Sequence, residues 1–230
     1  MLVRPRAKAA TALAQISAII AASVTSLFAA ASTAHADVDR EIAARYVRGG
    51  AAQVTISDIN ALVGDIDAQV SGASSLTWTR DGVGFDYNTA DLEPDAPYTM
   101  WWVTFNRPRK CLSACECGLV DLADPAVDAG VFFAGGRMTD QHGQADFAGE
   151  IDYGELPTGE DQIPFPGIEA AIKRRSEIHL VVREHGEALA DPADLKAQLT
   201  QFNGGCGPNS CNDVQVSIHR SQFCRKRSRR

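Results

Sequence analysis

The chain has 230 residues, 45% of them hydrophobic, which is enough length and apolar content for one globular domain with a proper core. Its formal net charge of −7 disfavours nucleic acid as a partner, because an acidic body repels the phosphate backbone. No Walker-type or dinucleotide-type glycine pattern and no G-x-S-x-G serine elbow occurs, so these nucleotide-binding and hydrolase classes have no support.

The first 36 residues have the layout of a secretory signal peptide. Basic residues within the first eight positions precede an uncharged run, which closes on Ala34-His35-Ala36, an A-x-A cleavage pattern. The alternative is a membrane anchor, but the run is rich in Ala and broken by Ser and Thr, so it is only weakly hydrophobic. We therefore predict cleavage after Ala36, a secreted or periplasmic location, and no transmembrane segment afterwards.

Removal of the leader makes the chain more acidic and leaves its charge unevenly placed. The 194 remaining residues include 19 basic and 29 acidic ones, a net charge of −10. Residues 220–230 hold six of the basic ones, so residues 37–219 have a net charge of −16. We interpret 220–230 as a basic tail that lies in solvent, on the acidic body or on anionic envelope surfaces. We expect no nucleic acid among the partners, and the oligomeric state stays open.

Residues 37–72 are predicted to be a partly helical N-terminal segment. A short helix is expected in 37–47. In 57–70 apolar residues recur at helical spacing, with Ser57 or Asp58 as the N-cap and Gly64 as a weak point.

From residue 73 to residue 219 the pattern indicates a β domain. Strands are expected at 75–80 and 83–88, joined at Asp81-Gly82, a dipeptide that suits a tight hairpin turn. Residues 98–105 (YTMWWVTF) place Trp102 on one face and Trp101 on the other. Since both faces are apolar, this segment is predicted to be a central strand covered on both sides.

The remaining segments complete a fold that is mainly β. Asp191 and Pro192 are typical of the N-cap and first position of a helix. Residues 213–219 alternate cleanly between Val or Ile and polar side chains, and one helical turn is expected within 166–175. Further strands are predicted at 131–136, 143–154, 177–182 and 213–219. The fold class is therefore a β-sandwich or partly open barrel of seven or eight strands, with two or three short peripheral helices, stapled by disulfides.

An even number of cysteines in an exported chain indicates three disulfides, for which 15 pairings exist. A bond between Cys115 and Cys117 would close too small a ring. The pairing that we favour has two short loops and one long link: Cys111–Cys117, Cys206–Cys211 and Cys115–Cys224. The rival reading is a zinc site formed by the first three cysteines, but their spacing lacks a matching second pair, so we predict no metal.

The segment SEIHLVVREHG, residues 176–186, raises the question of a histidine site. On one strand, His179 and His185 would share a face about 20 Å apart, too far to bind one zinc ion. A structural role is favoured for both. If a ligand site exists, we place it between the cysteine loop and this strand, with an exposed tryptophan for carbohydrate or small-molecule binding. The candidate ligand-binding residues are Trp101, Trp102, Arg107, His179, Arg183 and His185.

The first functional prediction is an exported non-enzymatic domain that binds a small molecule or glycan, or interacts with the cell envelope. No catalytic residue and no cofactor is assigned. The alternative is a metal-dependent hydrolase or redox protein, which requires three groups to converge from the acids and from His142, His179, His185 and His219. An acidic series from Asp146 to Glu155 could supply paired carboxylates, but it is spread as on a solvated face.

A resemblance to a known group of proteins rests on five segments: YTMWWVTFNRP, DPAVDAGVFFAGG, GQADF, SEIHLVVREHG and FNGGCGPNSCNDVQVSIH. Over residues 76–219 the chain resembles a group of uncharacterised secreted bacterial proteins, and its strand pattern is more weakly similar to CHRD-type domains. The resemblance implies a disulfide-bearing, mostly β extracytoplasmic domain. It carries over no catalytic residues.

Overall fold

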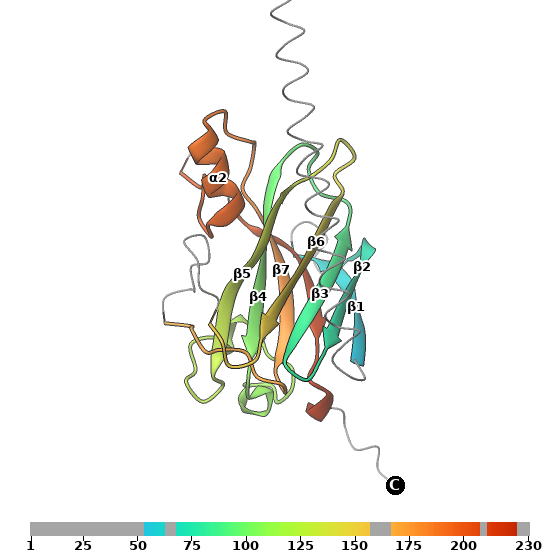
Figure 1. Cartoon of the computed structure of the whole chain (residues 1–230), viewed down its shortest axis with the longest axis vertical. Helices are drawn as coiled ribbons and strands as arrows, with labels where there is room; N and C mark the ends of the chain where they lie inside the picture. Colours follow the sequence, from blue (N-terminus) through green and yellow to red (C-terminus); the bar gives the residue numbers. More distant parts are fainter. Residues whose placement is uncertain (1–52, 63–67, 157–166, 208–210, 225–230) are drawn as a thin grey trace, which may run out of the picture. The chain divides into compact units, whose positions relative to one another are not determined.

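The computed structural model describes residues 53–62, 68–156, 167–207 and 211–224. The predicted signal peptide, the helix expected in 37–47 and the tail beyond residue 224 lie outside these ranges. Eight strands and one α-helix make up the regular structure of the described part (Figure 1). They are β1 (Gln53–Ala61), β2 (Gln69–Trp78), β3 (Gly82–Thr89), β4 (Pro97–Phe105), β5 (Ala129–Met138), β6 (Ala145–Asp152), β7 (Glu177–Glu184), α2 (Pro192–Thr200) and β8 (Asp213–His219).

The eight strands form one antiparallel sheet in the order β5-β4-β7-β8-β1-β2-β3-β6. The sheet curls until its two edge strands, β5 and β6, approach each other, and the guanidinium Nε of Arg137 donates to the Asp146 carbonyl at 3.2 Å across this seam. The fold of the described residues is therefore a nearly closed barrel made of one sheet, as the partly open barrel alternative predicted. The strands predicted at 131–136 and 143–154 exist as β5 and β6. They are the two edge strands of the sheet and approach each other only where those edges meet.

The helix predicted over 57–70 is wrong. Residues 53–61 form β1, which pairs with β2 along most of its length and with β8 at Ile59, Asn60 and Ala61. Burial alternates along β1, so that Ile56 is 79% exposed on the outer face while Ile59 is fully buried on the inner face. The sheet therefore begins before residue 73.

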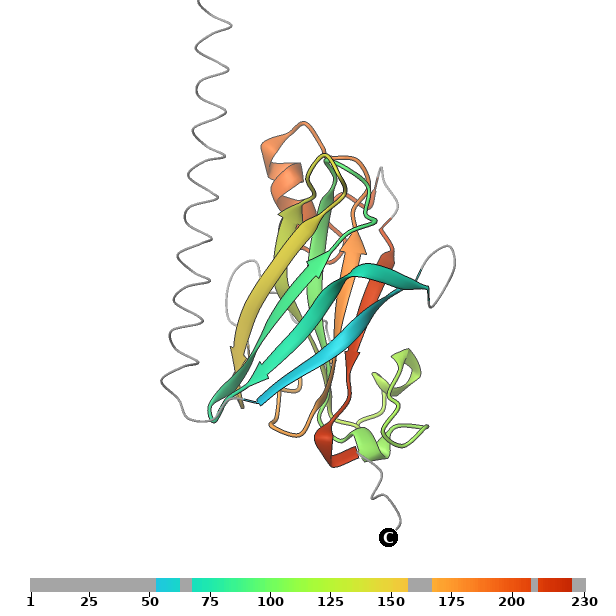
Figure 2. The same cartoon turned by 90° about the vertical axis from the view of Figure 1, so that its right-hand side faces the viewer.

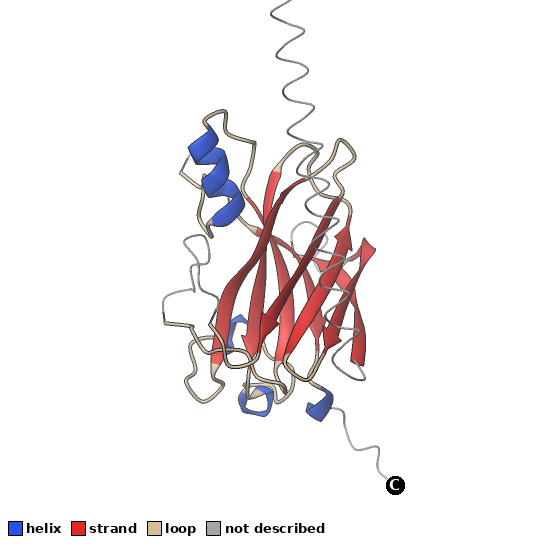
Figure 3. Ribbon diagram, in the orientation of Figure 1, coloured by secondary structure: helices blue, strands red, loops and turns tan. Residues whose placement is uncertain are grey.

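The helical content among the described residues is one α-helix and three single 3-10 turns at Pro108–Lys110, Leu119–Asp121 and Gln222–Cys224. The predicted start of α2 is confirmed, because the Asp191 carboxylate accepts from the N–H groups of Ala193 and Asp194 and Pro192 follows the cap. No helical turn forms in 167–175, the described part of 166–175. The helix α2 lies at one end of the sheet and the 3-10 turns at the other (Figure 3). No helix in the described ranges is long and apolar enough to cross a membrane.

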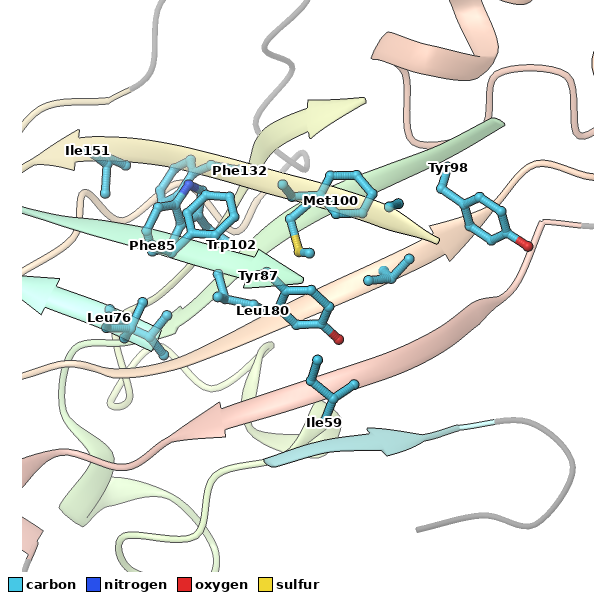
Figure 4. Packing of buried hydrophobic residues seen from close by; sticks show 14 of the residues in the cluster. Ile59, Leu76, Phe85, Tyr87, Tyr98, Met100, Trp102, Phe132, Ile151 and Leu180 are labelled. Carbon is cyan, nitrogen blue, oxygen red and sulfur yellow. The ribbon is translucent and has the colours of Figure 1, made fainter. Parts of the chain in front are cut away.

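Two apolar clusters lie on the two faces of the sheet. The inner cluster fills the barrel with large side chains from nearly every strand, including Trp102, Phe85 and Leu180 (Figure 4). The outer cluster lies against β4, β5 and β7 and is covered by the cysteine loop, residues 106–128. Every residue of β4 is consequently buried, which confirms the prediction of a central strand with two covered faces.

All three predicted disulfides are present. Cys111–Cys117 and Cys206–Cys211 close short loops of sequence separation 6 and 5. Cys115–Cys224 joins the cysteine loop to the end of the described chain across a separation of 109 residues. The zinc reading of the first three cysteines is wrong, because each of them is bonded to another cysteine.

Candidate functional site

An apolar pocket of about 210 Å³ lies on the outer face of β4, β5 and β7, and we call it the Trp101 pocket. The cysteine loop covers one side of it and the segment that follows α2 covers another. Its lining consists of eight apolar side chains and one carboxylate: Trp101, Val103, Leu119, Leu122, Val131, Ile168, Val181, Phe202 and Asp213. The pocket therefore lies in the region between the cysteine loop and β7 that the sequence pointed to.

Trp101 is a rigid wall of this pocket. Its ring meets Phe133 edge to face at a centroid distance of 5.6 Å and Phe202 at 5.0 Å. Its indole Nε1 donates to the hydroxyl of Thr99 at 2.8 Å, so its only polar atom is satisfied inside the protein. The part of the indole that lines the pocket is thus apolar and fixed in orientation.

His185 supports Trp101 through Thr99. Its Nδ1 lies 2.7 Å from the Gly204 carbonyl, which can only accept, so Nδ1 carries the proton. Its Nε2 lies 2.8 Å from the Thr99 hydroxyl and accepts from it. Burial of the imidazole lowers its pKa below the ordinary value, and the fully buried ring is held neutral. The structural role predicted for this histidine is consistent with these contacts.

Arg183 fastens the opposite wall of the pocket. Its Nε donates to the Phe202 carbonyl at 2.8 Å, and its guanidinium lies 4.0 Å from the centroid of the Phe202 ring. A second nitrogen pairs with the Asp213 carboxylate at 2.7 Å. Arg183 is therefore a positioning residue for Phe202 and neutralises the one charged group of the lining.

His179 lies away from the Trp101 pocket, beneath the cysteine loop. Its Nε2 is 3.0 Å from Oε1 of Glu177, and the same oxygen accepts from the Cys117 N–H at 3.1 Å. The ring of His179 packs against Phe105 at a centroid distance of 5.0 Å. The other Glu177 oxygen, Oε2, is buried and has no hydrogen-bond partner. This pair ties the loop to β7.

Neither of the two adjacent tryptophans offers an exposed surface. Trp101 and Trp102 are each only 2% exposed, and Trp102 points into the barrel, where Phe85 meets it edge to face. Arg107 is exposed beyond the end of β4 and does not line the pocket. The expectation of an exposed tryptophan as a stacking platform is wrong, because the cysteine loop and the inner core cover both faces of β4.

A second and more polar pocket, of about 590 Å³, opens where β1 and β8 diverge beyond their short ladder (Figure 2). His219 lines it, and the ring nitrogen Nε2 lies 2.9 Å from the Ser74 hydroxyl, which contacts the Ser217 hydroxyl at 2.7 Å. The polar side chains that alternate along β8 therefore face the barrel interior. Burial, reinforced by the neighbouring His179, lowers the pKa of His219 to about 4.

The convergence that a metal-dependent hydrolase requires is not found. Within 53–62, 68–156, 167–207 and 211–224, the single group of three ligand atoms within 4.8 Å is His185 with Cys206 and Cys211, and these cysteines form a disulfide. His142 is exposed in the turn between β5 and β6. His179 and His219 belong to separate networks on opposite faces of the sheet. Asp146 is exposed and bonds Asn88, as expected for a solvated face.

Of the nine residues that line the pocket, the predicted ligand-binding residues included only Trp101. Phe202, Asp213 and Leu122 stand far from Trp101 in sequence, and each looks like an ordinary loop or strand-end residue. Pairing of β7 with β8 places Asp213 there, and packing of the cysteine loop and of the segment after α2 on the outer cluster brings Leu122 and Phe202 to the same place. The one sequence feature that indicated an apolar wall here was Val181, an apolar residue on the outward face of β7. No family model, curated protein or solved structure matches this chain.

Proposed function

We propose that this protein is an exported, non-enzymatic β-barrel domain that binds a small apolar molecule in the Trp101 pocket. The observation that carries the proposal is an almost wholly apolar pocket whose walls come from seven separate segments of the chain. Apolar pockets with few polar groups are the usual form of small-molecule sites. The lining offers one polar acceptor, Asp213, whose charge is already balanced by Arg183.

The pocket volume limits the ligand. A cavity of about 150 Å³ with apolar walls accepts benzene, so 210 Å³ accommodates one substituted ring and excludes a peptide or an oligosaccharide. A hydroxyl or amine on that ring could donate to Asp213. With Trp101 and Trp102 buried, a glycan cannot stack on either indole, and the apolar ligand is favoured over the glycan.

The extracytoplasmic location belongs to the same proposal. Three disulfides persist in oxidising compartments, and the predicted signal peptide and the resemblance to secreted bacterial proteins support export. The exposed side chains of Leu112, Leu119 and Val120 on the cysteine loop are the feature that would favour the envelope-interaction alternative.

A monocyclic phenol tests the pocket directly. The chain has three tryptophans, which give three indole N–H signals in a ¹⁵N-correlated spectrum, and only Trp101 lines the pocket. Titration with 4-methylphenol is expected to shift the Trp101 signal, assigned with Trp101→Phe, with a Kd of about 0.1–1 mM. The signals of Trp78 and Trp102, both on the inner face, should stay in place.

A filled pocket provides the control for this titration. Val181 is half-buried in the lining, so Val181→Phe places a ring in the cavity and should abolish the shift. Val54→Phe adds the same ring at an exposed position of β1 and should bind like the native protein. Equal shifts in the native protein and Val181→Phe, or shifts of all three indole signals alike, would refute the site.

A further inference from the structure

The loop that follows α2 brings two sulfur atoms beside a buried imidazole. The Nδ1 of His185 and the Sγ atoms of Cys206 and Cys211 all lie within 4.8 Å of one another, and Cys211 Sγ is 3.5 Å from Nδ1. The three residues come from the end of β7, from the loop after α2 and from the segment just before β8. The first functional prediction used none of them as metal ligands, and the Trp101 pocket does not include them.

The disulfide is not what holds these residues together. The Glu184 N–H donates to the Asn212 carbonyl at 2.9 Å, and the Asn212 side chain donates to the Glu184 carboxylate at 2.7 Å, which fixes the residue next to Cys211 against the end of β7. Gly204 packs so closely on α2 that an added Cβ would lie 1.8 Å from the Ala197 carbonyl. The thiols would therefore stay beside His185 after the S–S bond opens.

Access to this disulfide differs from access to Cys111–Cys117. Both cysteines of the latter are buried, at 5% and 7% exposure, whereas Cys206 and Cys211 are half-buried. Exposed disulfides exchange with external thiols more readily, because the attacking thiolate must reach a sulfur atom. Two thiolates and one imidazole are then the ligand types that Zn²⁺ prefers.

We propose that the Cys206–Cys211 disulfide is reducible, and that its reduced form binds one thiophilic cation, Zn²⁺ in the first instance, through both sulfurs and His185 Nδ1. A dithiol reductant supplies two electrons and two protons, becomes a disulfide itself, and leaves two cysteine thiols. Binding of Zn²⁺ then releases both thiol protons. His185 gives up its bond to Gly204 and moves its proton to Nε2, where the Thr99 hydroxyl oxygen accepts it.

The Thr99 hydroxyl is well placed for this second role. Metal-binding histidines commonly donate their other N–H to an oxygen, which fixes the ring and its tautomer. Thr99 Oγ1 already lies 2.8 Å from Nε2 and has two lone pairs, one of which accepts from Trp101. The second lone pair accepts from the metal-bound imidazole without movement of the ring.

Partial reduction and metal titration test the two parts of the proposal. Limited treatment with a water-soluble phosphine, followed by alkylation and mass mapping, is expected to label Cys206 and Cys211 before the buried pair Cys111 and Cys117. The reduced protein should bind one Zn²⁺ per chain, and Co²⁺ in its place should give a thiolate-to-metal absorption band. The oxidised protein should show neither. Labelling of Cys111 and Cys117 before Cys206 and Cys211, or no band after reduction, overturns the proposal.

Matched variants separate the site from general thiol binding. His185→Asn is expected to weaken Zn²⁺ binding by the reduced protein at least tenfold. The control is His142→Asn, which replaces an exposed histidine and should leave Zn²⁺ binding unchanged. Cys211→Ser provides a second test in case His185→Asn does not fold, and it should remove the absorption band. If reduced native protein and His185→Asn bind Zn²⁺ equally, the imidazole is no ligand and the site is refuted.

Discussion

Replacement of Cys115 and Cys224 by serine is expected to lower the free energy of unfolding by about 4–5 kcal/mol, the largest loss for any one disulfide. The bond closes a loop of sequence separation 109, and the entropy that a cross-link removes from the unfolded chain grows with loop length. Both cysteines are half-buried, so serine fits without a cavity. Urea unfolding at neutral pH measures the difference.

The short disulfide Cys206–Cys211 provides the matched control. The same double replacement there is expected to cost about 2 kcal/mol, because the loop has a separation of only 5 residues. A loss at Cys115 and Cys224 no greater than the loss at Cys206 and Cys211 would contradict the role of the long link as the main staple.

His219 is expected to make the protein less stable in weak acid. Its pKa of about 4 in the folded state lies below the ordinary 6.5, so the unfolded chain binds a proton that the folded protein refuses. The contribution is present in full above pH 6.5 and is lost as the pH falls toward 4. From pH 7 to pH 4 it lowers the free energy of unfolding by about 3 kcal/mol.

The measurement is a comparison of pH dependences. Unfolding by urea at pH 7, 5.5 and 4 should show a decline that is about 3 kcal/mol smaller in His219→Gln than in the native protein. His142→Gln removes an exposed histidine and should follow the native curve. Parallel curves for the native protein and His219→Gln would show that the imidazole is not buried in its neutral form.

Segments with strong local signals could be predicted from the sequence. The apolar residues on both faces of 98–105 demand a covered strand wherever it lies, and β4 is fully buried. The Asp191 carboxylate accepts from the first N–H groups of α2, and Pro192 suits the first helical position because it has no N–H to satisfy, so local geometry alone sets this helix start. The disulfide pairing was favoured rather than deduced: ring size argues against Cys115–Cys117, and pairing Cys111 with Cys117 in a short loop leaves Cys115 for Cys224.

The segments that depended on distant contacts could not be predicted. The apolar spacing in 57–70 fits a helix, but pairing with β2 and β8 overrides this local preference. The alternation in β8 was correct, yet it cannot reveal that Ser217 and His219 face inward, because their partner there, the hydroxyl of Ser74, is 143 residues away from Ser217 in the sequence. Buried polar side chains require such partners.

The candidate site, like the fold, could be predicted from the sequence only in part. The sequence located a region near Trp101 and β7, and it identified Arg183, which holds Phe202. It assigned the wrong surface to Trp101, because the cover that the cysteine loop and Phe202 provide is a tertiary contact. His179 and His185 are separated along β7 as expected, and each serves a different part of the structure.

The measurement that tests the central claim most directly is the detection of intermolecular nuclear Overhauser effects between 4-methylphenol and methyl-labelled native protein. The proposal predicts contacts from the phenol ring to the methyl groups of Val131 and Val181, which line the Trp101 pocket. Contacts to inner-face methyl groups such as those of Leu180, or none at all at saturating phenol, would contradict a ligand site in this pocket.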